Sequence, residues 1–241
     1  MKHAKRHPLI FGTIILTATG LITRVIGFFY RIYLSRLFGE EGMGIYQLLS
    51  PALSLSFSLT AAGYQTAISK YVAADSAKRP SGNLKPLLAG ISITLPLSLV
   101  TNAILFFSAD PIGIFLLKDP RTVPMLRILS FSVPFAALHA CINGYFYGKK
   151  KAFVPALTQL LEQLARVSCV FLVTGADLAE GRTPSIYAAV LGLTVGEIFS
   201  MLIALVCLYI HLYPDSSILS LQNICPSVPV YRDLLGMALP L

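Results

Sequence analysis

Charged residues are scarce in this sequence: Asp, Glu, Lys and Arg make up 12% of it, whereas 55% is hydrophobic and the mean hydropathy is +0.72. An ordinary soluble domain carries about 25% charged residues, which form the polar surface around its core. The composition therefore excludes an ordinary soluble domain and favours lipid as the solvent. The net charge of +8 is not by itself a sign of nucleic-acid binding, because its distribution along the chain decides its meaning.

Cysteine is also sparse, and its spacing excludes two kinds of site. The four cysteines form no CxxC pair, and three of them lie in apolar runs. They are Cys141, Cys169, Cys207 and Cys225. We expect reduced, packed thiols rather than a disulfide framework or a zinc site. The GxxxxGK[ST] phosphate-binding loop is missing as well, so we expect no ATP site, no cofactor and no bound metal.

Apolar runs of transmembrane length fill most of the chain. About 20 apolar residues are needed to cross the hydrocarbon core. Six runs meet this requirement, at about 9–35, 43–72, 86–107, 123–147, 153–174 and 184–213. The first run follows a basic tail, as in a secretory signal, but no small-residue cleavage site follows it. The sequence therefore predicts an all-α, polytopic membrane helix bundle, with residues 1–213 forming a lobe of six transmembrane helices.

The last residues begin another apolar run. Pro226 and Pro229 mark residues 223–230 as a linker, and residues 231–241 would form about 16 Å of helix, roughly half of the hydrocarbon core. We expect residues 214–241 to comprise a cytoplasmic linker and the start of an interrupted seventh helix. On this interpretation the chain is a fragment or a truncated gene product.

Positive charge is distributed unevenly between the two sides of the predicted bundle. One side carries Lys2, Lys5, Arg6, Lys78, Arg79, Lys85, Lys149, Lys150, Lys151 and Arg232. The other side carries Lys118, Arg121 and Arg182 among acidic residues. Because cytoplasmic loops are enriched in Lys and Arg, both ends of the chain are predicted to be cytoplasmic. The excess of basic residues then reflects topology and lipid headgroups, and no nucleic acid is expected as a partner.

Two arginines lie inside the first span, where a charge is costly and marks a functional candidate. Arg24 and Arg31 are nearly two helical turns apart, so they share one face at a separation of about 10 Å. That face is polar along its length and comprises Thr13, Thr17, Gly20, Arg24, Phe28, Arg31 and Ser35. Planar guanidinium groups match phosphate oxygens, so two of them suit a diphosphate. We predict that Arg24, Arg31 and Thr17 line a substrate cavity; alternatively, Arg31 reaches the outer interface and Arg24 pairs within the bundle.

A second set of polar residues lies in the fifth and sixth spans. Glu162 and Arg166 have the i,i+4 spacing of a helical ion pair, and Gln159 precedes them on the same helix. Together with Glu197 in the sixth span they form a predicted intramembrane charge network. Two readings stay open, because a self-neutralising pair can be purely structural or can serve cavity polarity and proton coupling.

Small and lone polar residues in these spans are assigned to packing. Gly192 and Gly196 have the spacing that allows two membrane helices to approach closely, and we expect Glu197 beside them to lie in a packed interface. His139, in the fourth span, is expected to be a hydrogen-bonded interior residue rather than a ligand.

Several motifs taken together resemble the stage V sporulation protein B family. They are residues 23–28 with Arg31, residues 36–46, residues 67–70, residues 144–148, Pro155 with Gln159, Glu162, Gln163 and Arg166, and residues 238–240. This family is part of the multidrug/oligosaccharidyl-lipid/polysaccharide exporter superfamily, whose members have two six-helix lobes around a central cavity. In the related lipid II flippase, arginines of the first helix line that cavity. Arg24 occupies the matching position, and Arg31 matches with an offset of one residue.

The resemblance implies a flippase that moves undecaprenyl-diphosphate-linked glycan precursors across the bacterial plasma membrane by alternating access. Such precursors serve peptidoglycan of the cell wall, the spore cortex or other polysaccharides. The expected partners are a lipid-linked oligosaccharide or lipid II-like substrate, the bilayer and, for a fragment, a separate carboxyl-terminal half. A fragment alone is expected to insert into the membrane without flipping substrate.

Three alternative interpretations of the sequence stay open. A multidrug or cation antiporter of the same superfamily needs an acidic cavity, which the two arginines oppose. A membrane enzyme needs convergent acids or a His–Asp pair at a loop edge, and His211 with Asp215 has no further partner, so no enzyme is expected. A truncated gene product without function is the third alternative.

The predicted orientation can be tested by labelling single cysteines in a cysteine-free variant. Lys150→Cys should be shielded from an impermeant maleimide added outside intact cells, whereas Glu180→Cys should react, because the two positions lie on opposite sides of the membrane. The reverse pattern would overturn the assigned orientation.

Overall fold

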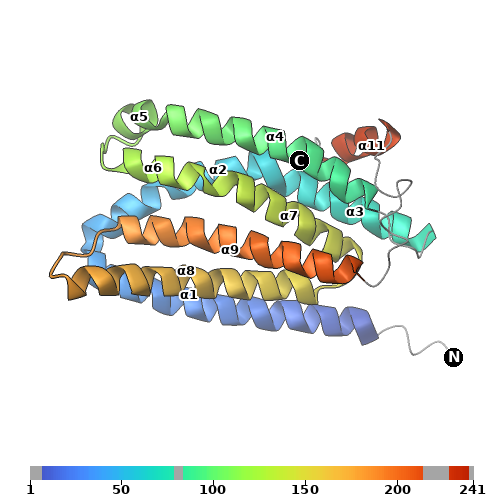
Figure 1. Cartoon of the computed structure of the whole chain (residues 1–241), viewed down its shortest axis with the longest axis horizontal. Helices are drawn as coiled ribbons and strands as arrows, with labels where there is room; N and C mark the ends of the chain where they lie inside the picture. Colours follow the sequence, from blue (N-terminus) through green and yellow to red (C-terminus); the bar gives the residue numbers. More distant parts are fainter. Residues whose placement is uncertain (1–6, 79–83, 214–227, 239–241) are drawn as a thin grey trace.

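The computed structural model describes residues 7–78, 84–213 and 228–238, and all regular structure in these residues is helical. The helices lie side by side in an elongated bundle (Figure 1). The elements are α1 (His7–Leu48), α2 (Ser50–Phe57), η1 (Ser58–Ala62), α3 (Gly63–Lys78), α4 (Lys85–Phe107), α5 (Ala109–Pro111), η2 (Ile112–Leu116), α6 (Thr122–Ser130), α7 (Ser132–Gly148), α8 (Phe153–Ala179), α9 (Tyr187–Leu212) and α11 (Val228–Ala238). The predicted all-α membrane bundle is confirmed.

Five helical stretches are long and apolar enough to cross a membrane, judged by length and composition. The first, Gly12–Ser76, has 65 residues, about three times the length that one crossing needs. Figure 1 shows that this stretch turns back on itself, with α1 running one way and α2 and α3 the other. The part of the chain described here therefore has six apolar arms, close to the six predicted runs.

The connection between the first two arms is more helical than predicted, although its break lies inside the predicted gap of residues 36–42. The helix does not end at residue 35 but continues through α1 to Leu48, broken only at Gly39. Gly39 has φ 67° and ψ −173°, a backbone conformation that L side chains rarely adopt. One glycine therefore reverses the chain where the sequence suggested a longer non-helical connection.

The second and fourth arms are bent without being interrupted. A π-helical turn, η1, separates α2 from α3. The fourth arm changes direction at Phe131, between α6 and α7. Pro96 lies inside α4, and Pro51 occupies the first turn of α2, where its missing N–H costs no helical hydrogen bond.

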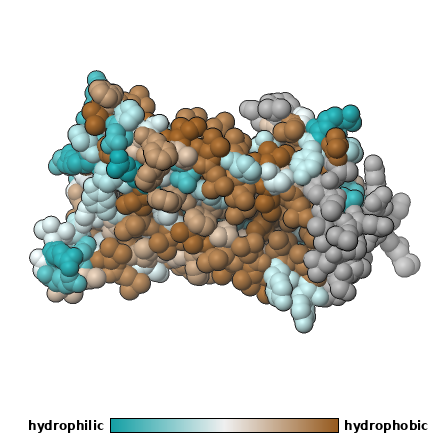
Figure 2. All heavy atoms as spheres, turned by 45° about the horizontal axis from the view of Figure 1, so that its top comes forward, coloured by the Kyte–Doolittle hydropathy of each residue, from teal (hydrophilic) through white to brown (hydrophobic). Residues whose placement is uncertain are grey.

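An apolar belt surrounds the middle of the bundle. On the face seen in Figure 2, hydrophobic side chains form a continuous band, and hydrophilic side chains gather towards the end that carries α5 and α6. Large apolar side chains on this belt are exposed, including Leu21 (64%), Phe107 (78%) and Leu172 (74%). Since such a surface is stable only in an apolar solvent, the chain is a multi-pass membrane protein.

The interior has two apolar cores separated along the bundle. One lies towards the turn at Gly39 and includes Leu34, Leu126 and Val190. The other lies towards the opposite end and includes Ile68 and Tyr145. Polar side chains are buried between them, including Ser56, Thr60, His139, Asn143, Thr158 and Ser200.

Glycines set the closest approaches between helices. A Cβ on Gly144 of α7 would lie 2.6 Å from the carbonyl oxygen of Gln65 in α3. A Cβ on Gly192 of α9 would lie 2.6 Å from Val170 Cγ2, and one on Gly196 would lie 3.3 Å from the carbonyl oxygen of Glu162. The small-residue packing predicted for positions 192 and 196 is therefore confirmed, and the partner helix is α8.

The last helix begins earlier than predicted. Within the predicted linker 223–230, residues up to 227 lie outside the described residues, but α11 already begins at Val228. Pro229 fits in the first turn of the helix because the N–H groups there have no acceptor within the helix, so the N–H that proline lacks costs no hydrogen bond. Val230 and Leu234 are buried against α3 and α4, so α11 packs along the lobe. The division at residue 214 stays a prediction.

An ionic cluster joins two connections at the end near Gly39. Arg121 donates hydrogen bonds to Glu41 Oε1 at 2.7 Å and to both carboxylate oxygens of Asp119 at 3.1 and 3.0 Å. The hydrogen bonds from Arg121 hold the pKa of the Asp119 carboxyl below its usual value. Lys149, Lys150 and Lys151 lie at the other end, so the two predicted sides of the bundle are separate, while their orientation in the membrane stays a prediction.

The close approach of α3 and α7 predicts an asymmetry between two glycine substitutions. Gly144→Ala should destabilise the protein by about 1–3 kcal/mol, because the new methyl group meets a backbone carbonyl that cannot rotate away. Gly175→Ala is the matched control: no atom lies within 4 Å of its Cβ position, and alanine favours helix. Thermal unfolding in detergent should show a lower Tm for the first variant only. Equal Tm values would contradict this helix contact.

Candidate functional site

A cavity of about 410 Å³ lies between α1, α8 and the corner that follows Gly39. Its polar lining residues are Arg24, Tyr30, Arg31, Tyr46, Gln163 and Arg166, and its remaining lining is Gly27, Phe28, Leu34 and Met43. Arg24 and Arg31, which the sequence placed on one face of the first helix, both line it. Thr17 lies nearer the start of α1 than Arg24; it is exposed and does not line this cavity.

The packing of α1 on α8 positions the arginines. Tyr33 of α1 stacks on Phe171 of α8 with ring centroids 4.2 Å apart, and its hydroxyl lies 2.8 Å from Thr174 Oγ1. One turn or two before this contact, Gly27 allows α1 to approach Gln163, whose Nε2 would lie 3.5 Å from a Cβ on this glycine. These contacts fix the rotation of α1, so the face with Arg24 and Arg31 borders the cavity.

Neither first-helix arginine is neutralised in the part of the chain that the structure describes. Arg24 and Arg31 are exposed, and no ion pair to either is found among the described residues. The interior pairing considered for Arg24 is therefore not observed. Two guanidinium groups with free donors on one cavity wall suit an anion.

A third arginine reaches the same cavity from α8. Arg166 Nη2 donates to Glu162 Oε1 at 2.5 Å, the contact that the i,i+4 spacing predicts, and Nη1 lies 3.4 Å from Gln163 Oε1. Its Nε is enclosed and has no hydrogen-bond partner among the described residues. The i,i+4 spacing predicts the pair of Arg166 with Glu162. It does not predict that Arg166 lies beside the first helix, since only the packing of α1 on α8 brings Arg166 to that helix.

The rest of the predicted charge network lies around a different cavity. Gln159, Glu162 and Glu197 line a cavity of about 250 Å³, together with His139 and Asn143. Arg166 lines the cationic cavity and its partner Glu162 lines this acidic one, so the ion pair lies between the two. His139 is buried and hydrogen-bonded, as expected.

Tyr30 and Tyr46 in the cationic cavity were not predicted. Both tyrosines line the cavity, and the Tyr30 hydroxyl is enclosed by protein without a partner among the described residues. In the sequence they look like ordinary aromatic residues of apolar spans, and no spacing signal marks them.

Residues 9–230 match the model of a family described as polysaccharide biosynthesis protein. The chain belongs to this family. It is 34% identical over 230 residues to stage V sporulation protein B of Bacillus subtilis (strain 168), covering 95% of this chain and 44% of that protein. It is 27% identical over 179 residues to lipid II flippase MurJ of the same organism, covering 70% of this chain and 32% of that protein. The chain thus spans less than half the length of these relatives.

The fold of this family member is that of a known transporter class. An outward-facing multidrug resistance MATE family transporter of the MOP superfamily superposes with a TM-score of 0.70 at 17% sequence identity. The match covers 97% of this chain and 50% of that transporter. The functions named for these proteins are those of a flippase and a transporter, which agrees with the membrane bundle found here.

The ion pair of α8 should behave as a unit in stability measurements. Glu162→Gln or Arg166→Gln alone leaves one charge uncompensated among side chains that are 17% and 19% exposed, at an expected cost of about 3–5 kcal/mol. The double variant should cost less than the sum of both. Unfolding in detergent, followed by Tm and denaturant midpoint, measures the three variants. Strictly additive losses would mean that the two side chains do not interact in the folded protein.

Proposed function

We propose that this chain forms one lobe of a flippase that moves undecaprenyl-diphosphate-linked glycan precursors across the bacterial plasma membrane. The observation that carries the proposal is the cavity with three arginines, Arg24, Arg31 and Arg166. The family, described by polysaccharide biosynthesis, and the similarity to a lipid II flippase support the same substrate class. In this proposal the second lobe of the flippase is supplied outside the residues of this chain.

The diphosphate group of such a substrate fits the chemistry of the cavity. Each guanidinium group can donate two parallel hydrogen bonds to phosphate oxygens, and charge-assisted bonds of this kind are about twice as strong as neutral ones. Arg24 and Arg31 have no anionic partner among the described residues, so substrate binding displaces no ion pair from them. The apolar flank of α1, with Phe28 and Phe29 63% exposed, leaves the isoprenoid tail in contact with the bilayer.

Transport follows if the cavity opens to the two sides of the membrane in turn. A binding site between two lobes that rock against each other achieves this, and bent helices are suited to such motion. The break at Gly39 lies in α1, which lines the cavity, and the π-helical turn η1 bends the next arm. Energy would come from ion gradients or the membrane potential.

A multidrug or cation antiporter is less consistent with the cavity. The similarity to a MATE transporter at 17% identity shows the fold alone. Cationic substrates require acidic groups at the binding site, whereas no carboxylate lines the 410 Å³ cavity among the described residues. The charge of this cavity therefore favours an anionic cargo.

Binding of diphosphate by the purified chain tests the proposal. Arg24→Gln should weaken binding of inorganic diphosphate and of undecaprenyl diphosphate by about 10- to 100-fold, because a charge-assisted hydrogen bond contributes about 1.5–3 kcal/mol. Arg24→Lys should recover part of the loss, since a point charge replaces a bidentate group. Titration calorimetry in detergent gives each Kd.

The matched control is Arg36→Gln, which removes an exposed arginine of the same helix that does not line the cavity. Its Kd should equal that of the unmodified chain. If Arg24→Gln binds both ligands as tightly as Arg36→Gln does, Arg24 is not a headgroup ligand and the proposal fails.

A further inference from the structure

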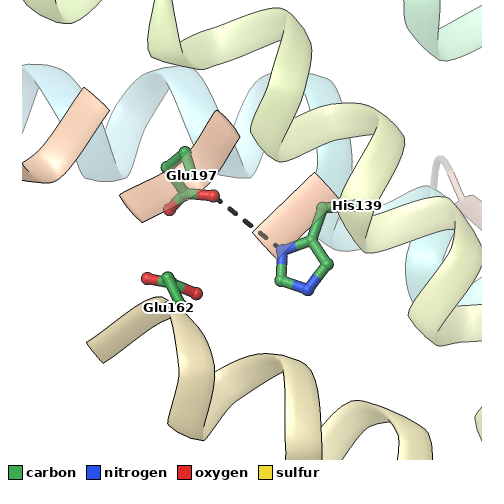
Figure 3. Close-up of side chains that lie close together, drawn as sticks. All are labelled: His139, Glu162 and Glu197. Atoms are coloured by element: carbon green, nitrogen blue, oxygen red, sulfur yellow. Dashed lines mark ion pairs between the residues drawn. The ribbon is translucent and has the colours of Figure 1, made fainter. Parts of the chain in front are cut away.

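Three ligand-bearing side chains meet in the bundle, in the cavity of about 250 Å³ that is lined by Glu162, the ion-pair partner of Arg166. His139 comes from α7, Glu162 from α8 and Glu197 from α9 (Figure 3). One nitrogen or oxygen atom from each lies within 4.8 Å of the others. This arrangement needs three helices, so no spacing in the sequence marks it.

The cluster lies deep in the membrane-spanning part. Glu162 is about 14 Å along α8 from Phe153, and Glu197 about 15 Å along α9 from Tyr187, at a rise of 1.5 Å per residue. The side chains of His139, Glu162 and Glu197 are 11%, 17% and 24% exposed. At this depth charged groups are costly unless they are paired or bind an ion.

The fixed charges of the cluster do not balance. The cluster has two carboxylates, and the ion pair of the neighbouring guanidinium group, Arg166, is with Glu162 at 2.5 Å. Glu197 has its nearest cationic candidate in His139, whose Nδ1 lies 3.9 Å from Glu197 Oε2, too far for a hydrogen bond. The gap between these atoms has the size expected when a cation belongs between them.

The donor set indicates the class of cation. Hard cations such as Na⁺, Mg²⁺ and Ca²⁺ prefer all-oxygen sites, whereas imidazole with carboxylates suits Zn²⁺, Fe²⁺, Co²⁺ and Mn²⁺. An ion centred among three atoms separated by at most 4.8 Å lies within about 2.8 Å of each, so a small inward movement of the side chains reaches the 2.0–2.2 Å of zinc–nitrogen and zinc–oxygen bonds. Arg166 already compensates Glu162, so a bound cation supplies the positive charge that Glu197 lacks.

The surroundings of His139 are those of a metal ligand. An imidazole that binds metal through Nδ1 carries its proton on Nε2 and donates it to a neighbour. Ser200 Oγ lies 2.9 Å from Nε2 but also 3.3 Å from Nδ1, so it is off the Nε2–H direction and is not this acceptor. The amide of Asn143, 2.7 Å from Nε2, can accept the hydrogen bond through its oxygen when the amide group is turned over, because the two orientations have the same shape.

We propose that His139, Glu162 and Glu197 form a binding site for one divalent transition-metal ion, which joins α7, α8 and α9 at the centre of the lobe. Gln159 and Asn143 line the same cavity and complete its polar wall. The site is separate from the cationic cavity and does not depend on what that cavity transports.

Metal binding by the purified chain, with any affinity tag removed, tests this site. One Zn²⁺ should bind per chain and raise the Tm, and Co²⁺ should give the d–d absorption of a nitrogen–oxygen site without thiolate charge transfer. His139→Ala and Glu197→Gln should each lower the Zn²⁺ affinity by about 100-fold, since loss of an outer-shell partner alone costs 10–100-fold. Glu197→Gln keeps the shape of the side chain, so it reports on binding even if His139→Ala does not fold.

Two variants control for adventitious binding. His211→Ala removes a histidine at the end of α9, and Glu40→Gln removes an exposed carboxylate near the chain reversal; neither side chain lines the cavity. Both should bind Zn²⁺ as the unmodified chain does. The proposal is overturned if the unmodified chain binds no stoichiometric Zn²⁺, if Co²⁺ shows thiolate charge transfer, or if Glu197→Gln binds as tightly as Glu40→Gln.

Discussion

The contact between Arg166 and Glu162 is the constraint around which the centre of this bundle is arranged. A guanidinium group cannot lose its charge at membrane depth, so it needs a partner or a polar cavity. Arg166 has both, since Glu162 accepts its hydrogen bond at 2.5 Å and the guanidinium group lines the cationic cavity, whereas Glu162 lines the acidic one. The pair therefore separates a cationic region along α1 from an acidic region between α7, α8 and α9.

This polar centre is tolerated because apolar packing lies on both sides of it. The two large buried cores occupy opposite ends of the bundle, and glycines at 144, 192 and 196 allow close approach to atoms of Gln65, Val170 and Glu162 on neighbouring helices. In a bilayer the lipid chains are themselves apolar, so no hydrophobic driving force acts between helices. Close packing of this kind holds the helices together instead. The fold can then hold Arg166, Glu162, Glu197 and His139 in its interior.

Much of the fold was predictable, and the misses have local causes. The apolar runs located the spans to within a few residues, since every backbone group in lipid needs a helical partner. The break at Gly39 lies inside the predicted gap between the first two spans, residues 36–42, but the rest of that gap is helical because one glycine suffices for the break. Pro229 was assigned to a linker, although the first turn of α11 accommodates it.

The candidate site was predictable only where its residues share a helix. The three-four periodicity of α1 placed Arg24 and Arg31 on one face, and the i,i+4 rule paired Glu162 with Arg166. Arg166 beside Arg24, the cavity tyrosines, and His139 beside Glu162 and Glu197 depend on how separate helices are rotated against each other. Sequence alone therefore determined the solvent, the spans and the polar helix faces, because these follow from composition and helical period. Tertiary structure decided which charges face one another, because contacts such as Tyr33 with Phe171 and Gly192 with Val170 fix helix rotation and register across the bundle.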